Sequence, residues 1–123
     1  MLTELAQFRY QLRRFLHFSE RAAREAGVTP QQHQLMLGVA GFTGRGWANI
    51  SELAEFLQTR HNAVVALVNR ACQKGLVKKT AVAEDLRVMR VELSAKGWKI
   101  LLRLSALHRK ELERAQMRFG SRR

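Results

Sequence analysis

The chain has 123 residues, 46% of them hydrophobic and 26% charged, with a formal net charge of +12. This length predicts a single domain, and this hydrophobic content argues against a disordered chain. No apolar stretch approaches the ~20 residues that cross a bilayer, and the amphipathic N-terminus lacks a small-residue cleavage site, so we expect neither a membrane span nor a secretory signal. Cys72 is the only cysteine, which excludes an intramolecular disulfide and favours a cytoplasmic location.

The positive charge is concentrated in the second half of the chain. Residues 61–123 hold 15 basic and 5 acidic side chains, a net charge of +10, whereas residues 1–60 hold 7 and 5. A field of this size attracts polyanions, so nucleic acid is the favoured partner. The alternative is a solvated basic face with no partner, and charge alone does not separate the two.

The first predicted element is a helix over residues 2–26, which Gly27 is placed to end. Its apolar stripe recurs every three or four residues, at Leu5, Phe8, Leu12, Phe15, Ser19 and Ala22. A second helix is predicted to begin at Pro30, with Thr29 as its cap, and to run to about Gly41. The glycines that follow predict a loop from which Trp47 anchors into the core.

Two more helices are predicted at residues 51–57 and 60–74. Asn49 or Ser51 would cap the first, and Thr59 would cap the second. Gly75 is placed to end the second. The inward residues of the first would be Leu53, Ala54 and Leu57. The buried side of the second would be Val64, Leu67, Val68 and Ala71.

Residues 76–81 and 88–93 are predicted to form a β-hairpin around a polar tip at residues 83–87. In the second strand apolar and polar residues alternate, as a half-buried strand requires. Ser94 would then cap a last helix over residues 95–119. The fold class is therefore mainly α with a small β-hairpin wing (α+β). Residues 1–123 would form one domain, with a winged helix-turn-helix core at 28–97 between two flanking helices at 2–26 and 95–119.

The helix at 60–74 is the candidate for reading DNA. The major groove, about 12 Å wide, admits one helix, in which Arg suits guanine edges, Asn suits adenine, and small apolar residues suit thymine methyls. The outward residues of this helix would be Arg60, His61, Asn62, Val65, Ala66, Asn69 and Arg70. A polar face that is merely solvated is the alternative, but the order of the elements favours DNA binding.

The predicted hairpin adds further basic side chains. Lys78, Lys79, Arg87 and Arg90 suit contacts with phosphates or insertion into the minor groove. Asp85 is unexpected in a hairpin that approaches DNA. It could hold Arg87 by an ion pair or be an ordinary turn residue, and its spacing leaves both readings open.

Five segments, in this order, resemble the multiple-antibiotic-resistance regulator (MarR) family of winged helix-turn-helix regulators. They are Thr29-Pro30-Gln31-Gln32, Ser51-Glu52-Leu53-Ala54, Lys74-Gly75-Leu76-Val77, Asp85-Leu86-Arg87 and Leu93-Ser94-Ala95-Lys96-Gly97. The resemblance implies a homodimeric transcription factor, usually a repressor, on a pseudo-palindromic operator. It also implies that Arg87 enters the minor groove and that Asp85 orients it. Some relatives bind a small-molecule effector or a metal, but no residue here identifies such a ligand, and we expect no cofactor.

The flanking helices are more apolar than one small domain needs, which favours a two-fold interface between copies of the chain. The alternative is that both helices close over the core of a single copy. The candidate interface residues are Leu5, Phe8, Leu12, Phe15, Leu101, Leu104 and Leu112.

Nothing in the sequence indicates an enzyme. The four histidines lie on different segments, no metal-ligand spacing occurs, and neither a nucleophile elbow nor a glycine-rich phosphate loop is present. Cys72 is expected to be an inert thiol rather than a redox sensor. The sequence thus predicts a sequence-specific regulator of transcription that binds double-stranded DNA as a homodimer. The alternative is a winged-helix module that binds protein.

Overall fold

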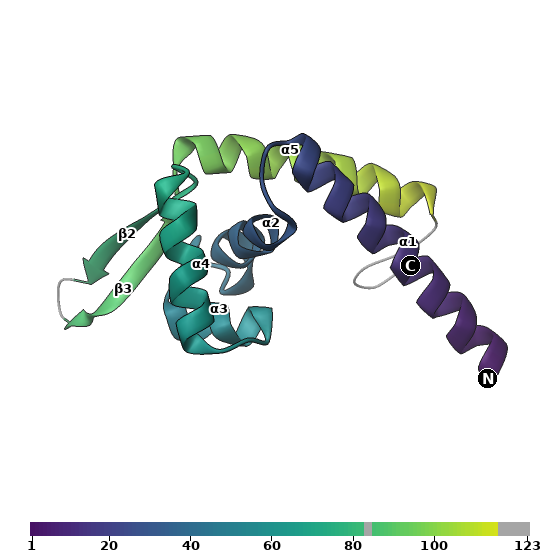
Figure 1. Ribbon diagram of the computed structural model, residues 1–123, viewed down its shortest axis with the longest axis horizontal. Coiled ribbons are helices and arrows are strands. Elements are labelled where there is room, and N and C mark those ends of the chain that lie inside the picture. The colour runs from purple at the N-terminus through teal and green to yellow at the C-terminus, as the bar shows by residue number, and fades with distance from the viewer. Residues whose placement is uncertain (83–84, 116–123) are drawn as a thin grey trace. The chain divides into compact units, whose positions relative to one another are not determined.

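The computed structural model describes residues 1–82 and 85–115, with the backbone alone for residues 82 and 85–87. Two compact units are present: Gln31–Leu101, and Met1–Pro30 together with Leu102–Arg123. Among the described residues, no helix combines the length and the apolar character needed to cross a membrane. The elements are α1 (Leu2–Glu25), α2 (Pro30–Leu37), a π-helical turn η1 (Gly38–Phe42), β1 (Trp47–Ala48), α3 (Ile50–Leu57), α4 (His61–Gln73), β2 (Val77–Val82), β3 (Asp85–Leu93) and α5 (Ala95–Arg114) (Figure 1).

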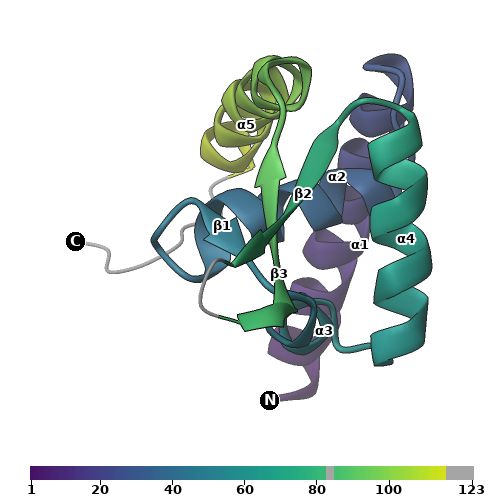
Figure 2. The same ribbon diagram turned by 90° about the vertical axis from the view of Figure 1, so that its left-hand side faces the viewer.

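The unit Gln31–Leu101 has the helix-turn-helix and the hairpin that the sequence predicts. Its α3 and α4 pack on one another, and the β2–β3 hairpin lies beside α4 (Figures 1 and 2). The buried side of α4 is the predicted set, since Val64, Leu67, Val68 and Ala71 are all buried. They pack in a core whose largest fully buried side chains also include Leu35, Met36, Leu53, Leu76 and Val91.

The sheet has three antiparallel strands in the order β1-β3-β2. The sequence did not predict β1, a strand of two residues in which Trp47 pairs with Glu92 and Ala48 with Val91. So short a strand has no local signal, because its pairing with β3 spans more than forty residues of chain.

The second hairpin strand starts earlier than predicted. β3 begins at Asp85 rather than Val88, so residues 85–87 are part of a strand and not of the tip. The pairing passes from Ala81↔Met89 to Val82↔Asp85, with an irregularity between Ala81 and Val82. The polarity of this segment predicts a turn, but side-chain polarity does not reveal backbone pairing with the opposite strand.

Side chains alternate between the two faces of this sheet, because directly paired residues share a face and neighbours in a strand do not. The registers place Ala48, Val77, Lys79, Val91 and Leu93 on one face, which we call the inner face. Ala48, Val77, Val91 and Leu93 are buried. The opposite, outer face carries Trp47, Lys78, Thr80, Arg90 and Glu92.

The helix ends follow local chemistry. Asn49 caps α3 through a reciprocal capping box: its Oδ1 accepts from the Glu52 N–H, and the Glu52 carboxylate accepts from the Asn49 N–H, both at 2.9 Å. Gly75 ends α4 as predicted, with φ +75° and a hydrogen bond from the Leu76 N–H to the Ala71 carbonyl. The predicted cap of α4 was wrong: Arg60, not Thr59, is its N-cap, and no side chain caps it.

The last helix begins where the sequence predicts. Ser94 caps α5 by accepting from the Gly97 N–H at 2.9 Å, and its hydroxyl lies 2.5 Å from the Gly75 carbonyl oxygen. This serine therefore joins the start of α5 to the end of α4. The helix is described to Arg114, and the predicted end at residues 116–119 lies outside the described residues.

The unit built from the two ends of the chain brings α1 next to the second half of α5. The His108 ring spans them: its Nε2 lies 2.7 Å from the Ser19 hydroxyl, and its Nδ1 lies 2.7 Å from the Leu104 carbonyl. The rings of Phe15 and Phe18 meet the His108 ring edge-on, at 5.7 and 5.3 Å between centroids. A polar link inside an aromatic cluster thus fixes the register of the two helices.

Candidate nucleic-acid interface

The candidate interface is the outward side of α4. Arg60, His61, Asn62, Asn69 and Arg70 are exposed, as predicted. Val65 and Ala66 are half-buried, so they contribute less open surface than their spacing predicts. These positions recur every three or four residues and therefore line one side of the helix.

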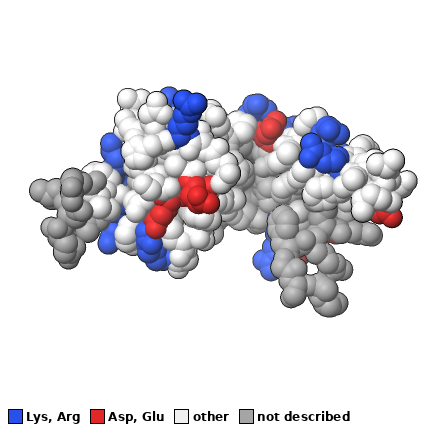
Figure 3. Space-filling view, turned by 90° about the horizontal axis from the view of Figure 1, so that it is seen from below, with Lys and Arg blue, Asp and Glu red and all other residues white. Residues whose placement is uncertain are grey.

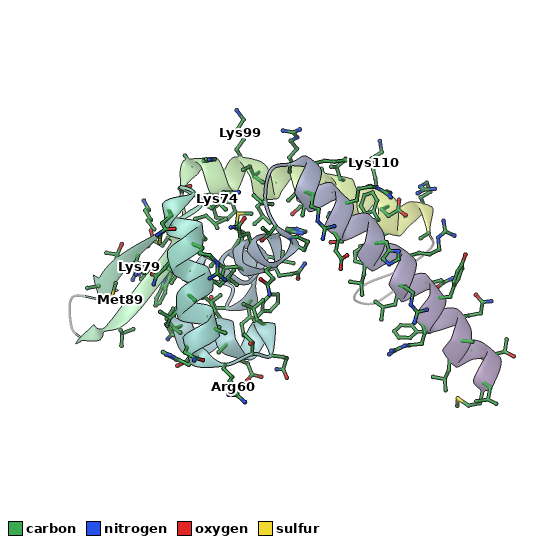
Figure 4. The ribbon with its side chains drawn as sticks, in the orientation of Figure 1. Arg60, Lys74, Lys79, Met89, Lys99 and Lys110 are labelled. Carbon is green, nitrogen blue, oxygen red and sulfur yellow. The ribbon has the colours of Figure 1, made fainter. Side chains whose placement is uncertain are left out.

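The α4 surface extends from the turn after α3 to the end of the helix. Figure 4 shows Arg60 and Lys74 at the two ends of α4, with Lys79 beside the helix on the hairpin. A shallow hollow of about 520 Å³ lies at the first end, and its lining includes Glu55, Arg60 and His61. The first backbone N–H groups of α4 have no capping side chain here, and the start of a helix favours negative charge.

The predicted hairpin contacts fall on two faces of the sheet. Lys79 lies on the inner face and reaches α4, where its Nζ donates to the Asn69 Oδ1 over 2.7 Å. Lys78 and Arg90 lie on the outer face, away from α4. The alternation of side chains along a strand separates Lys78 from Lys79 although they are neighbours in sequence.

Arg90 is engaged within the protein. Its guanidinium stacks on the Trp47 ring, 4.3 Å from the centroid, and lies 3.5 Å from the Glu92 carboxylate. Arg45 stacks on the same ring, at 3.7 Å. The prediction that Trp47 anchors into the core was therefore wrong: it is half-buried on the outer face, and two arginines contact its ring.

Sequence reasoning missed this arginine–tryptophan cluster. Arg45 also pairs with Glu52, at 2.5 Å, and so joins the cluster to the capping box of α3. Burial alone would raise the pKa of the Glu52 carboxyl, but the Asn49 N–H and the Arg45 guanidinium together hold it below its ordinary value. The sequence offered only one signal for this cluster, the short separation of Arg45 and Trp47 along the chain. Arg90 is brought to Trp47 by the pairing of β1 with β3.

On the face that Figure 3 shows, the charged side chains are dispersed rather than gathered in one patch. Figure 3 shows the side that looks downward in Figure 1, to which α3 and the start of α4 belong, with single basic side chains around an acidic group. The two wing residues that the family resemblance singles out, Asp85 and Arg87, have side chains outside the described residues. Their proposed roles stay predictions.

The candidate residues of the dimer interface differ in how far their side chains are exposed to solvent. Leu5 and Phe8 are 52% and 56% exposed, and Leu12, Phe15 and Leu112 are half-buried. Leu101 and Leu104 are 3% and 1% exposed, so they are already covered within a single copy of the chain.

In the described part of the chain, no cluster of His, Cys, Asp or Glu side chains could hold a metal ion.

A helix-turn-helix followed by a paired hairpin, with an exposed helix face between them, defines a winged helix-turn-helix protein. The model of the MarR family matches residues 26–87, which is half of the chain, and the chain belongs to this family. The sequence-based assignment to the family is thereby confirmed.

One relative is similar over part of the chain. Over 71 residues the chain is 32% identical to the HTH-type transcriptional repressor MdtR of Bacillus subtilis, a match that covers 58% of this chain and 44% of that protein. The match thus spans less than half the length of this relative.

Solved structures share the fold. YusO of Bacillus subtilis matches with a TM-score of 0.71 and 22% identity, over 93% of this chain and 79% of that one. A mutant of MepR from S. aureus, solved bound to an oligodeoxyribonucleotide, matches with a TM-score of 0.75 and 16% identity, over 98% and 86%. AbsC of Streptomyces coelicolor, a MarR family transcriptional regulator, matches with a TM-score of 0.75 and 18% identity, over 94% and 79%.

Proposed function

We propose that the protein is a cytoplasmic, sequence-specific transcriptional regulator that binds double-stranded DNA as a homodimer, most simply as a repressor. Each copy would insert α4 into the major groove and the end of the hairpin, around residues 83–87, into the flanking minor groove. The observation that carries this proposal is the outward side of α4. Its side chains are polar, basic or small, and a core-packed helix holds them in fixed positions.

The geometry and charge of the unit support the proposal. Arg60, His61 and Asn62 lie at the start of α4, the part of a recognition helix that usually meets base edges. The hairpin lies beside the same helix and carries further lysines. A net charge of +10 over residues 61–123 favours rapid encounter with DNA.

The relatives lend separate support. MdtR is described as a transcriptional repressor, and the matched MepR mutant was solved with an oligodeoxyribonucleotide. Members of this family regulate transcription and do not act as enzymes, so we propose no catalytic activity for this chain.

The homodimer is part of the proposal because α1 exposes large apolar side chains to solvent in a single copy of the chain. Leu5 and Phe8 are more than half exposed, together with Leu2. A two-fold interface would cover this surface and would also set the spacing of two α4 helices on DNA. A small-molecule effector stays a prediction without an assigned site.

Selection of bound duplexes from a random pool tests the proposal. The pool should yield a shared motif with two-fold symmetry, since each half-site would meet one copy of α4. If the bound duplexes share no motif, the alternative is favoured: a winged helix that binds protein and has a basic face that only solubilises it.

A further inference from the structure

The link between Asn69 and Lys79 changes what the recognition helix can read. The two residues are ten positions apart and come from α4 and β2, and both are exposed. The Lys79 ammonium donates to the Asn69 Oδ1 over 2.7 Å. A side chain predicted to read a base and one predicted to grip a phosphate are thus paired with each other.

The direction of the Asn69 amide follows from this contact. An ammonium group carries only donors, so the amide atom that faces it must be the oxygen. The two N–H donors of the Asn69 amide are consequently directed away from Lys79. The usual ambiguity between amide oxygen and nitrogen is resolved here by the chemistry of the partner.

Asparagine reads adenine by accepting from the N6 amino group while it donates to N7. At Asn69 the accepting oxygen is held by a cation, and a cation beside it repels the partly positive N6 amino group. Guanine offers two acceptors at the same groove edge, O6 and N7. The two N–H bonds of the Asn69 amide and the remaining N–H bonds of Lys79 are donors that match these two acceptors. The second lone pair of the Asn69 oxygen lies beside the ammonium group, which disfavours the approach of an adenine N6 amino group.

We propose that Asn69 and Lys79 act together as a pair of donors that selects guanine in each half-site, and that Lys79 suppresses the adenine preference of Asn69. This inference rests on the proposed function and names one part of its specificity. Lys79 would then be a specificity-determining residue as well as a source of positive charge.

Lys78 offers a matched control. It is the sequence neighbour of Lys79, carries the same charge and is also exposed, but it lies on the outer face of the sheet and pairs in register with Glu92. Lys78→Met and Lys79→Met therefore remove the same charge from the same strand. Only the second releases the Asn69 oxygen.

The experiment compares motifs selected from one random duplex pool by the wild type, Asn69→Ala, Lys79→Met and Lys78→Met. We expect Asn69→Ala to lose a guanine preference at one position of each half-site. Lys79→Met should shift that same position toward adenine by about tenfold, the discrimination of one good bidentate contact. Lys78→Met should keep the wild-type motif with uniformly weaker binding.

The outcomes separate the two proposals. If Lys79→Met weakens binding and leaves the motif unchanged, or if the position lost in Asn69→Ala is adenine in the wild type, the reader pair is contradicted while DNA binding stands. If the wild type selects no motif, the proposed function itself fails. Circular dichroism of each variant checks that the fold is retained, which the exposure of all three side chains favours.

Discussion

Gly97, in the first turn of α5, lies directly against the backbone carbonyl of Leu76, so a β-carbon at residue 97 would overlap that oxygen. The Leu76 carbonyl also accepts from the Ser94 N–H at 3.0 Å. The start of α5 therefore packs on the residue that precedes β2 through backbone atoms, which cannot move aside as a flexible side chain can.

Gly97→Ala should lower the free energy of unfolding by about 1–3 kcal/mol, because the methyl group must displace backbone in a well-packed region. Urea denaturation followed by circular dichroism measures this change. Gly41→Ala is the control, since a β-carbon there meets no atom within 4 Å. Equal stabilities of the two variants would contradict the close packing at Gly97.

The predictions from sequence that were correct concern local properties of the chain, and most of those that were wrong depend on tertiary pairing. The inward face of α4 was predicted correctly because Val64, Leu67, Val68 and Ala71 follow the helical period, which is a local property of the chain. The Ser94 cap and the Gly75 helix end were also local and also correct. Trp47 was misplaced because its surroundings, Arg45 and Arg90, depend on the pairing of β1 with β3.

The candidate site shows the same division. Periodicity identified the outward residues of α4, but it could not reveal that Asn69 is held by Lys79 or that Arg90 is held by Trp47. Both contacts join residues of different elements across the tertiary fold. The burial of Leu101 and Leu104, predicted as interface residues, is likewise a result of packing that an apolar stripe does not specify.

Arg87 and Arg90 should differ in their contribution to DNA affinity. Arg87→Ala should weaken binding to a selected duplex by roughly tenfold or more, as expected for loss of an arginine in the minor groove. Arg90→Ala should weaken it by less than about threefold, because the Arg90 guanidinium already contacts Trp47 and Glu92 and only its long-range charge is lost. Fluorescence anisotropy at fixed moderate salt measures both, and equal losses would contradict the assignment.

Phe8→Glu should convert the proposed dimer to a monomer at micromolar concentration, because a carboxylate cannot be buried unpaired in an apolar interface. Light scattering after size exclusion measures the mass. Arg9→Glu is the matched control, since it places the same acid on the next, also exposed, residue of α1 without removing an apolar side chain. A dimer that survives Phe8→Glu would exclude this part of α1 from the interface.

Glu52 should make stability depend on pH. Its pKa is lowered in the folded protein, so the stabilisation it provides is complete above the unfolded pKa of about 4.3 and is lost as the pH falls through the lower folded pKa. Glu52→Gln keeps a residue suited to the capping box but removes the ion pair with Arg45. Urea midpoints at pH 7 and pH 3 should show a deficit in the variant at the higher pH that is smaller at the lower. A deficit of the same size at both would contradict the charge-based account.

In the proposed complex, α4 lies in the major groove and the end of the hairpin, around residues 83–87, lies in the minor groove. Methylation interference on a selected duplex tests both, since one reagent modifies guanine N7 in the major groove and adenine N3 in the minor groove. We predict that N7 methylation blocks binding in two symmetric clusters about 10 base pairs apart, with blocking N3 methylation at the flanks. Binding that tolerates N7 methylation throughout the selected motif would contradict the account.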